Sequence, residues 1–174
     1  MTGRLHQINM EYQAVEDRMV LRLNTTDQKE FRLWMTRRFA RQLWDALMKI
    51  MAQNPGIQKF QDPDAQKAMM AFEQDRVVKK EQFEQKFSEN AAEFPLGKEP
   101  QLLTGFAYHA AAEKKPGRIA FQTQKGADIN LPVNDQIVYS MAKMLANIVK
   151  QTGWDLKFEI GFGTDEVAKP ARVH

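Results

Sequence analysis

The chain has 174 residues, of which 43% are hydrophobic and 27% charged, and its 25 basic and 22 acidic side chains leave a formal net charge of +3. This composition excludes intrinsic disorder and collagen-like structure, and the length suits a single domain over residues 1–174. The absence of cysteine excludes disulfides, thiolate metal sites and cysteine nucleophiles. No apolar run approaches the ~20 residues of a membrane helix and no secretory signal is visible, so we expect a cytoplasmic protein without a membrane partner.

The first third of the chain is typical of three strands followed by a helix. The predicted elements are strands at about 5–15, 18–24 and 31–35 and a helix that begins after Thr36 and ends at residues 54–56. The alternation of Met19, Leu21 and Leu23 with other residues indicates a half-buried strand. Thr36 is a candidate N-cap, because its hydroxyl can accept a backbone hydrogen bond from the first turn. Residues 5–53 therefore form a predicted β-β-β-α unit.

Residues 62–94 form a predicted helical insertion with a different charge balance. Residues 62–99 carry nine acidic and six basic side chains, whereas residues 1–61 carry ten basic and six acidic ones. The irregular spacing of the apolar side chains indicates one bent helix or two shorter helices, running to about Glu93. We expect this insertion to pack against a sheet or a partner subunit.

The last third repeats the order of the first. The predicted elements are strands at about 102–112, 118–123 and 129–133, a helix capped by Asn134, and a final strand at 154–162 that extends the edge of a sheet. Residues 102–162 therefore form a second β-β-β-α unit plus this final strand. In the predicted alignment Arg18 matches Arg118, and Thr36 matches Asn134 after a turn that is two residues shorter.

This internal similarity predicts an α+β fold. Each unit supplies a sheet with one apolar face and a helix with one apolar stripe, and such layers bury these surfaces against each other. We predict two pseudo-symmetric β-β-β-α units of antiparallel strands that share one core, with the helical insertion between them. The strand pattern, the caps and the helix stripes agree in register, which favours duplication over chance similarity.

No sequence motif points to catalysis or to a bound cofactor. The chain lacks the motifs of hydrolases, kinases, P-loop proteins and metalloproteases, and Gly161 and Gly163 lack the third glycine of a dinucleotide site. His6 and His109 fall on corresponding strands, but zinc needs three or four ligands and no cluster supplies the others. We therefore predict a protein that is not an enzyme and has no catalytic residues, metal site or cofactor.

A basic and aromatic surface is the strongest functional signal in the sequence. The side chains that point away from the predicted core, or that begin the first long helix, are Arg18, Arg22, Arg32, Trp34, Arg37, Arg38 and Arg41. Cations follow the phosphates of a single-stranded nucleic acid, and planar groups stack on its bases. Arginine also offers flat, bidentate contacts that lysine lacks. We predict that these seven residues bind single-stranded DNA or RNA.

Two alternatives to this interpretation remain open. Trp34 can be buried beneath the insertion or a subunit partner. The arginines can pair across strands with the carboxylates of Glu11, Glu16 or Glu30. The second functional hypothesis is therefore a module for protein–protein interaction or assembly in a bacterial complex, such as a homo-oligomer, without catalytic activity.

The arrangement of two sheet-plus-helix units resembles the Whirly and PUR-type family of single-stranded nucleic-acid-binding proteins. The resemblance covers residues 5–53 and 102–162, with three strands in each unit where that family uses four. It implies antiparallel sheets closed by helices, and binding of single-stranded DNA or RNA. Residues 16–18 and 30–38 also resemble a segment of an uncharacterised bacterial protein family, which implies no activity.

Overall fold

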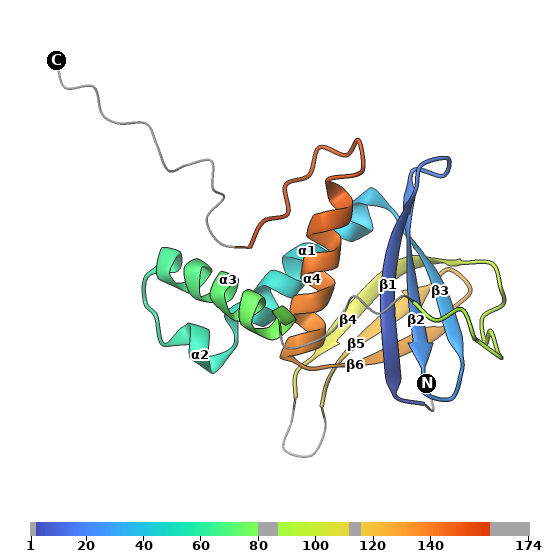
Figure 1. Ribbon diagram of the computed structural model, residues 1–174, viewed down its shortest axis with the longest axis horizontal. Helices are drawn as coiled ribbons and strands as arrows, with labels where there is room; N and C mark the ends of the chain where they lie inside the picture. The colour runs from blue at the N-terminus through green and yellow to red at the C-terminus, as the bar shows by residue number, and fades with distance from the viewer. Residues whose placement is uncertain (1–2, 80–86, 112–115, 161–174) are drawn as a thin grey trace.

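The computed structural model describes residues 3–79, 87–111 and 116–160 (Figure 1). Its elements in chain order are β1 (Leu5–Gln13), β2 (Arg18–Thr25), β3 (Glu30–Met35), α1 (Arg37–Ala52), α2 (Pro55–Gln58), α3 (Pro63–Lys79), β4 (Gln101–His109), β5 (Gly117–Thr123), β6 (Asp128–Val133) and α4 (Asp135–Val149). The strands form one mixed sheet. This combination of helices and sheet confirms the predicted α+β class.

The strands lie in the sheet in the order of the sequence. β1, β2 and β3 are antiparallel neighbours, and so are β4, β5 and β6. The junction between these two meanders is parallel, because Leu33 pairs with Gln101 and Trp34 with Leu102. A parallel neighbour requires a long crossover connection, and the chain from α1 to residue 98 supplies it.

One face of the sheet, which we call the inner face, is covered by α1 and α4 (Figure 1). The predicted apolar side of β2 lies on this inner face. Its side chains Met19, Leu21 and Leu23 have no exposed surface. α1 also presents its apolar stripe to the core, with Phe39, Leu43 and Leu47 buried. The alternation in the strand and the helical spacing after it therefore predicted the buried sides correctly.

A single hydrophobic core joins the two meanders. α1, which follows the first meander, contacts β4 of the second, while α4 contacts β1 of the first. The Phe39 ring of α1 lies 5.6 Å from the Phe106 ring and 6.3 Å from the Phe121 ring, measured between centroids. Each long helix thus stabilises strands that are distant from it in the sequence.

Both long helices begin at the predicted caps. The Thr36 hydroxyl accepts a hydrogen bond from the Phe39 N–H at 3.2 Å, and the Asn134 side-chain oxygen accepts one from the Ile137 N–H at 2.9 Å. Such caps satisfy N–H groups that have no partner inside the helix. The first turn of α4 contains Asp135, whereas the first turn of α1 contains no acidic residue.

The two meanders share a strand irregularity at positions 98 residues apart. The register of β1 against β2 shifts between Leu5 and Gln7, and the register of β4 against β5 shifts between Leu103 and Gly105. A bulge of this kind bends a strand locally and increases its twist. Its recurrence supports the prediction of pseudo-symmetric units, which stays a prediction.

The hairpin turns also correspond, and they have the same length. The Thr25 N–H donates to the Lys29 carbonyl at 3.0 Å, and the Thr123 N–H donates to the Ala127 carbonyl at 3.2 Å. In each turn the threonine hydroxyl also accepts a hydrogen bond from the last residue's N–H. The predicted shortening of the second turn is therefore wrong.

The strand registers correct the predicted alignment of the two units. In the second hairpin Arg118 pairs with Pro132. In the first hairpin, the pair at the same distance from its turn is Val20 with Trp34. Arg118 therefore corresponds to Val20 and not to Arg18. Similar side chains suggested the earlier match, but the hydrogen-bonding pattern decides which positions are equivalent.

The insertion contains a helix and an extended segment. α3 ends at Lys79, and residues 87–94 are not helical, so the helix predicted to run to about Glu93 is wrong for these residues. Their backbone pairs with the first hairpin instead: the Ala92 N–H donates to the Gln28 carbonyl, and the Glu30 N–H to the Glu93 carbonyl. We call residues 87–98 the strap. It lies on the side of β1–β3 opposite the two long helices, the outer face (Figure 1).

The segment after α4 is not the predicted strand. Residues 154–160 pair with no strand in the described structure, and the Leu156 N–H donates to the Trp154 carbonyl in a tight turn. Trp154 packs edge-on against Tyr12, and Phe158 stacks on Trp44 at 4.6 Å between centroids. Aromatic packing on β1 and α1 therefore accounts for the alternating pattern. Residues 161–162 of the predicted strand lie outside the described residues.

Candidate nucleic-acid interface

The structure divides the seven predicted residues into two groups. Arg22 and Arg32 lie on the outer face and contact the strap. The other five have no hydrogen bond, ion pair or ring contact to the strap within the described residues, and they are Arg18, Trp34, Arg37, Arg38 and Arg41. The first group is therefore covered by the protein itself.

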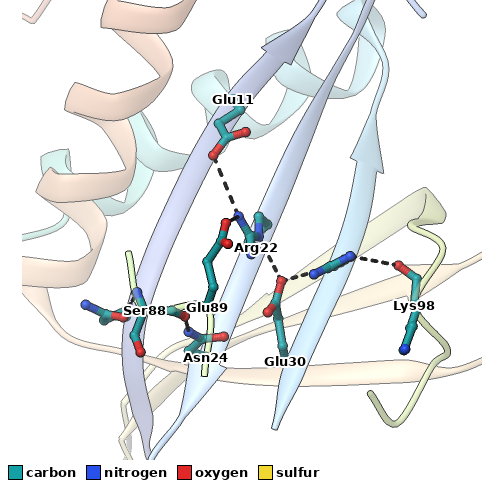
Figure 2. A network of polar contacts seen from close by, with 9 residues as sticks. Glu11, Arg22, Asn24, Glu30, Ser88, Glu89 and Lys98 are labelled. Carbon is teal, nitrogen blue, oxygen red and sulfur yellow. Dashed lines mark hydrogen bonds and ion pairs between the residues drawn. The ribbon is translucent and has the colours of Figure 1, made fainter. Parts of the chain in front are cut away.

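Glu30 holds the two covered arginines. Its Oε1 atom accepts hydrogen bonds from Nε of Arg22 at 2.8 Å and from Nε of Arg32 at 2.7 Å (Figure 2). The Glu30 side chain is 1% exposed and that of Arg22 is 11% exposed. Burial acts to raise the pKa of Glu30, but the hydrogen bonds and charges of the two guanidinium groups outweigh it and hold that pKa below its ordinary value. The carboxylate therefore stays charged in a site that would otherwise disfavour it.

Aromatic rings of the strap lie over both guanidinium groups. The Arg22 guanidinium carbon is 4.3 Å from the centroid of the Phe87 ring, and that of Arg32 is 4.8 Å from the centroid of Phe94. These separations are within the range of cation–π attraction. Each guanidinium group is thus held between Glu30 and a phenyl ring.

The strap also offers polar partners to the same arginines. Arg22 Nη1 lies 3.6 Å from a Glu89 carboxylate oxygen and 3.8 Å from one of Glu11 on β1. Arg32 donates from Nη1 to the Lys98 carbonyl at 3.3 Å (Figure 2). Arg22 and Arg32 therefore pair with carboxylates of the chain itself. This pairing is one of the two alternatives that the sequence left open.

The strap is fixed to the hairpin at further points along its length. The Asn24 side-chain amide donates to the Ser88 carbonyl at 2.7 Å, and the Ser88 N–H donates to the Gln7 side chain at 2.9 Å. Lys29 and Glu93 are partners in a parallel β-bridge, with an ion pair of 3.7 Å between their side chains. The first strand and both strands of the first hairpin therefore contact this segment.

The four arginines without a described contact to the strap lie at the end of the first meander, where β3 leads into α1. Met19 pairs with Met35, which places Arg18 beside the first residues after β3. Arg37, Arg38 and Arg41 are exposed on the first turns of α1, whereas Arg18 is half-buried. None of the four forms an ion pair within the described residues. Their positive charge is therefore available to an external anion.

Trp34 points to the outer face near the end of β3, three residues before Arg37 at the start of α1. Its neighbours across the strands are Val20 and Leu102, and its side chain is half-buried. Arg32 precedes it by two residues and points to the same face. Trp34 is therefore not fully enclosed by the described residues, and burial beneath the insertion, the other alternative, is incomplete.

Asp17 is an acidic neighbour of this region, but it has partners of its own. Its Oδ1 accepts hydrogen bonds from the Tyr12 hydroxyl at 2.6 Å and from the Trp154 indole N–H at 2.7 Å. These two hydrogen bonds and the nearby charge of Arg37 hold the pKa of Asp17 below its ordinary value. Asp17 therefore remains charged and weakens the positive potential near Arg37.

A cavity of about 670 Å³ lies elsewhere, near the far end of α1 from its arginines. Its lining includes Ile50, Arg76, Val77, Tyr108, Asn134 and Val138. Near it, burial and the charges of Glu73 and Asp135 raise the pKa of Tyr139 to about 12. The sequence analysis predicted nothing at this cavity.

The insertion was expected to pack against a sheet or a partner subunit, and its residues 87–94 do contact the first hairpin. Their cover of Arg22 and Arg32 was not predicted. A signal for it was present, since Phe87, Glu89, Glu93 and Phe94 combine acidic and aromatic side chains, the complement of a surface rich in arginine. The helix expected over these residues concealed this signal, because a helix would have turned them toward different neighbours.

No protein-family model, curated protein or solved structure matches the chain. Within the described residues, no group of three or more His, Asp or Glu side chains could hold a metal ion, and no helix is long and apolar enough to cross a membrane. The resemblance to the Whirly and PUR-type family stays a prediction, and the functional argument rests on geometry.

Proposed function

We propose that the protein binds single-stranded DNA or RNA without catalysing a reaction, at an interface formed by Arg18, Trp34, Arg37, Arg38 and Arg41. The observation that carries this proposal is a group of four arginines without a carboxylate ion pair in the described structure, at the end of the first meander where the half-buried Trp34 also lies. The N-terminus of α1 adds the positive end of the helix dipole, and no acidic residue of the first turn offsets it.

A single strand fits this arrangement better than a duplex. Its bases are free to stack on an aromatic ring, and each such stack contributes about 1–3 kcal/mol. Trp34 supplies one ring, while the arginines supply both charge and further planar surfaces. A duplex exposes its phosphates but keeps its bases stacked inside.

We also propose that the two β-β-β-α units are pseudo-symmetric and that the first has become the binding unit. The bulges, turns and helix caps that recur 98 residues apart support the symmetry. At the positions of Arg22, Arg32 and Trp34 the second unit has Ala120, Asn130 and Pro132. Binding is therefore assigned to one unit and not shared by both.

Titration of a fluorescently labelled single-stranded oligonucleotide tests this function. We expect binding that weakens steeply between about 50 mM and about 200 mM salt, because each neutralised phosphate releases counterions. The triple variant Arg37→Ala, Arg38→Ala, Arg41→Ala should flatten the slope of log affinity against log salt concentration by about 2, the value for three lost phosphate contacts on a single strand.

A matched variant controls for net charge. Lys143→Ala, Lys150→Ala, Lys157→Ala removes the same charge from exposed positions in and after α4, and should leave the affinity close to that of the wild type. Absence of binding at low salt, or binding that does not depend on salt, would contradict the proposal. Equal losses in the two triple variants would show attraction by net charge alone.

Assembly through a protein interface is the second candidate function. Phe72 on α3 is 61% exposed, and Phe60 between α2 and α3 is exposed as well. Exposed phenyl groups are favourable contact points for another protein or a second copy. Light scattering tests this candidate. A homo-oligomer that Phe72→Ser converts to a monomer supports it. A monomeric wild type contradicts assembly of the protein with its own copies.

A further inference from the structure

We propose that the strap is an intramolecular competitor of the nucleic acid, which covers Arg22 and Arg32 until a bound single strand displaces it. This inference rests on the proposed function and extends it, because it adds a second, covered part to the interface. It also assigns a regulatory role to residues 87–98, the first part of which the sequence predicted to be the end of a helix.

The first argument is chemical similarity between the strap and a single strand. Glu89 places a carboxylate 3.6 Å from Arg22, as a phosphate oxygen would be placed. Phe87 and Phe94 place flat rings over the two guanidinium groups, as bases would be placed. Arginine planes in single-strand complexes make both kinds of contact. The strap therefore satisfies the same groups that a nucleic acid would satisfy.

The second argument is that Glu30 prepares both guanidinium groups for an external anion. Glu30 binds each of them through Nε, while the Nη1 atoms of Arg22 and Arg32 contact Glu89 and Lys98 of the strap. With the strap removed, Nη1 of Arg32 would lose its carbonyl partner, and Nη1 of Arg22 would keep Glu11 of β1 as its remaining carboxylate neighbour. Both guanidinium groups would stay oriented by Glu30. Groups that are held in place beforehand lose less entropy on binding.

The third argument is that the strap is attached by contacts that a polyanion can replace. None of its residues is buried; each is half-buried or exposed. The acidic partners in its ion pairs are largely in solvent, since Glu89 is 80% exposed and Glu93 is 60% exposed. Exposed ion pairs of this kind contribute little and are screened by salt. Leu96 is the one described strap residue that packs against the hydrophobic core, and it is only half-buried, so release of the strap removes little of the core packing.

The arginines beneath the strap lie beside the part of the proposed interface that the strap leaves open. Arg32 lies on the same face of β3 as Trp34, two residues away. A single strand stacked on Trp34 therefore reaches the edge of the strap, and advances onto Arg32 and then Arg22 as the strap leaves. The apparent affinity of the protein is reduced by the fraction of molecules in which the strap is closed.

A reversible covalent lock tests this inference. Lys29 and Glu93 are partners in a β-bridge, and bridge partners are close enough for a disulfide. The chain has no other cysteine, so Lys29→Cys with Glu93→Cys forms one bond that closes the strap when oxidised and frees it when reduced. We expect the oxidised form to bind the labelled oligonucleotide about tenfold more weakly than the reduced form. The wild type, treated with the same oxidant and reductant, serves as the control.

The wild type provides a second readout that needs no variant. The N–H groups of Ala92 and Glu30 are bonded between strap and hairpin, and we expect their hydrogen exchange to accelerate when the oligonucleotide binds. Equal affinities of the oxidised and reduced lock, or slower exchange at these amides on binding, overturn the strap proposal while the proposed function stands. Absence of binding by every form, including the reduced lock, overturns both.

Discussion

The two meanders of the sheet have the same backbone plan and different outer faces. Both are antiparallel, with a bulge in the first strand, a five-residue turn and a capped helix at corresponding positions. On the outer face, the first carries Arg22, Arg32 and Trp34 with the strap across it, whereas the second carries Ala120, Asn130 and Pro132. The difference shows that the backbone plan requires neither the arginines nor the strap. We therefore attribute the arginines and the strap of the first meander to the function that we propose.

The largest expected effect on stability concerns the inner faces of the two meanders, which are packed differently by α1 and α4. Phe39→Ala removes the ring of α1 that packs on Phe106 and Phe121, and should destabilise the fold by about 4 kcal/mol because a cavity opens between the halves. The corresponding change in α4, Ile137→Ala, removes a half-buried side chain and should cost about 1–2 kcal/mol. Urea unfolding followed by circular dichroism measures both. Equal losses would show that α4 supports the core as strongly as α1 does.

A smaller effect should separate the outer faces. Glu30→Ala leaves Arg22 covered and without its closest carboxylate, and should destabilise the protein by about 3 kcal/mol. Asp128 occupies the corresponding position of the second hairpin but is exposed, so Asp128→Ala should change stability by less than about 0.5 kcal/mol. The same urea experiment decides the question. A loss below about 1 kcal/mol for Glu30→Ala would mean that water replaces the carboxylate.

The helix caps should behave alike, which sharpens the correspondence between the units. Thr36→Ala and Asn134→Ala each remove one side-chain acceptor at the start of a long helix, and each should cost about 1 kcal/mol. Thr36→Ser and Asn134→Ser, which keep an acceptor, should restore most of the stability. A cap that can be removed without loss would argue against equivalent roles for α1 and α4.

The smallest expected effect is in the pH dependence of stability. The pKa of Glu30 is lower in the folded chain than its ordinary value of 4.5, because the hydrogen bonds and charges of Arg22 and Arg32 outweigh the opposing effect of burial. Such a carboxyl stabilises the fold above its unfolded pKa, and this contribution is lost as the pH falls through the folded pKa. Urea midpoints measured from neutral pH to below 4.5 should fall less steeply for Glu30→Gln than for the wild type. Identical slopes would contradict the assignment.

Local patterns predicted the elements well. The alternation through Met19, Leu21 and Leu23 identified the buried side of β2, and Thr36 and Asn134 identified the helix starts. These features depend on residues close together in the sequence, and a strand of period two or a cap leaves a direct signal there. The final strand failed because Trp154 and Phe158 alternate with polar residues like a strand, although they pack on other aromatic rings.

The candidate site was predictable only in part. The seven residues were identified from their spacing and charge, and the pairing of arginines with Glu30 was recognised as an alternative. The division into covered and exposed arginines was not predictable, because it depends on residues 87–98 returning to a hairpin that is about sixty residues earlier in the chain. The acidic and aromatic side chains of residues 87–94 indicate what kind of surface this segment can contact, but the path of the backbone decides which surface it reaches.

By itself the sequence determined that this chain forms sheets with one apolar face, two capped amphipathic helices and a surface rich in arginine. Only the tertiary structure decided that all six strands join in one sheet, that each long helix packs on the other half, and that the strap covers Arg22 and Arg32. The physical reason is the separation in sequence over which each kind of interaction acts. Side-chain periodicity and capping act within a few residues, whereas the junction of β3 with β4 and the closure of the strap depend on surfaces that exist only once the chain has folded.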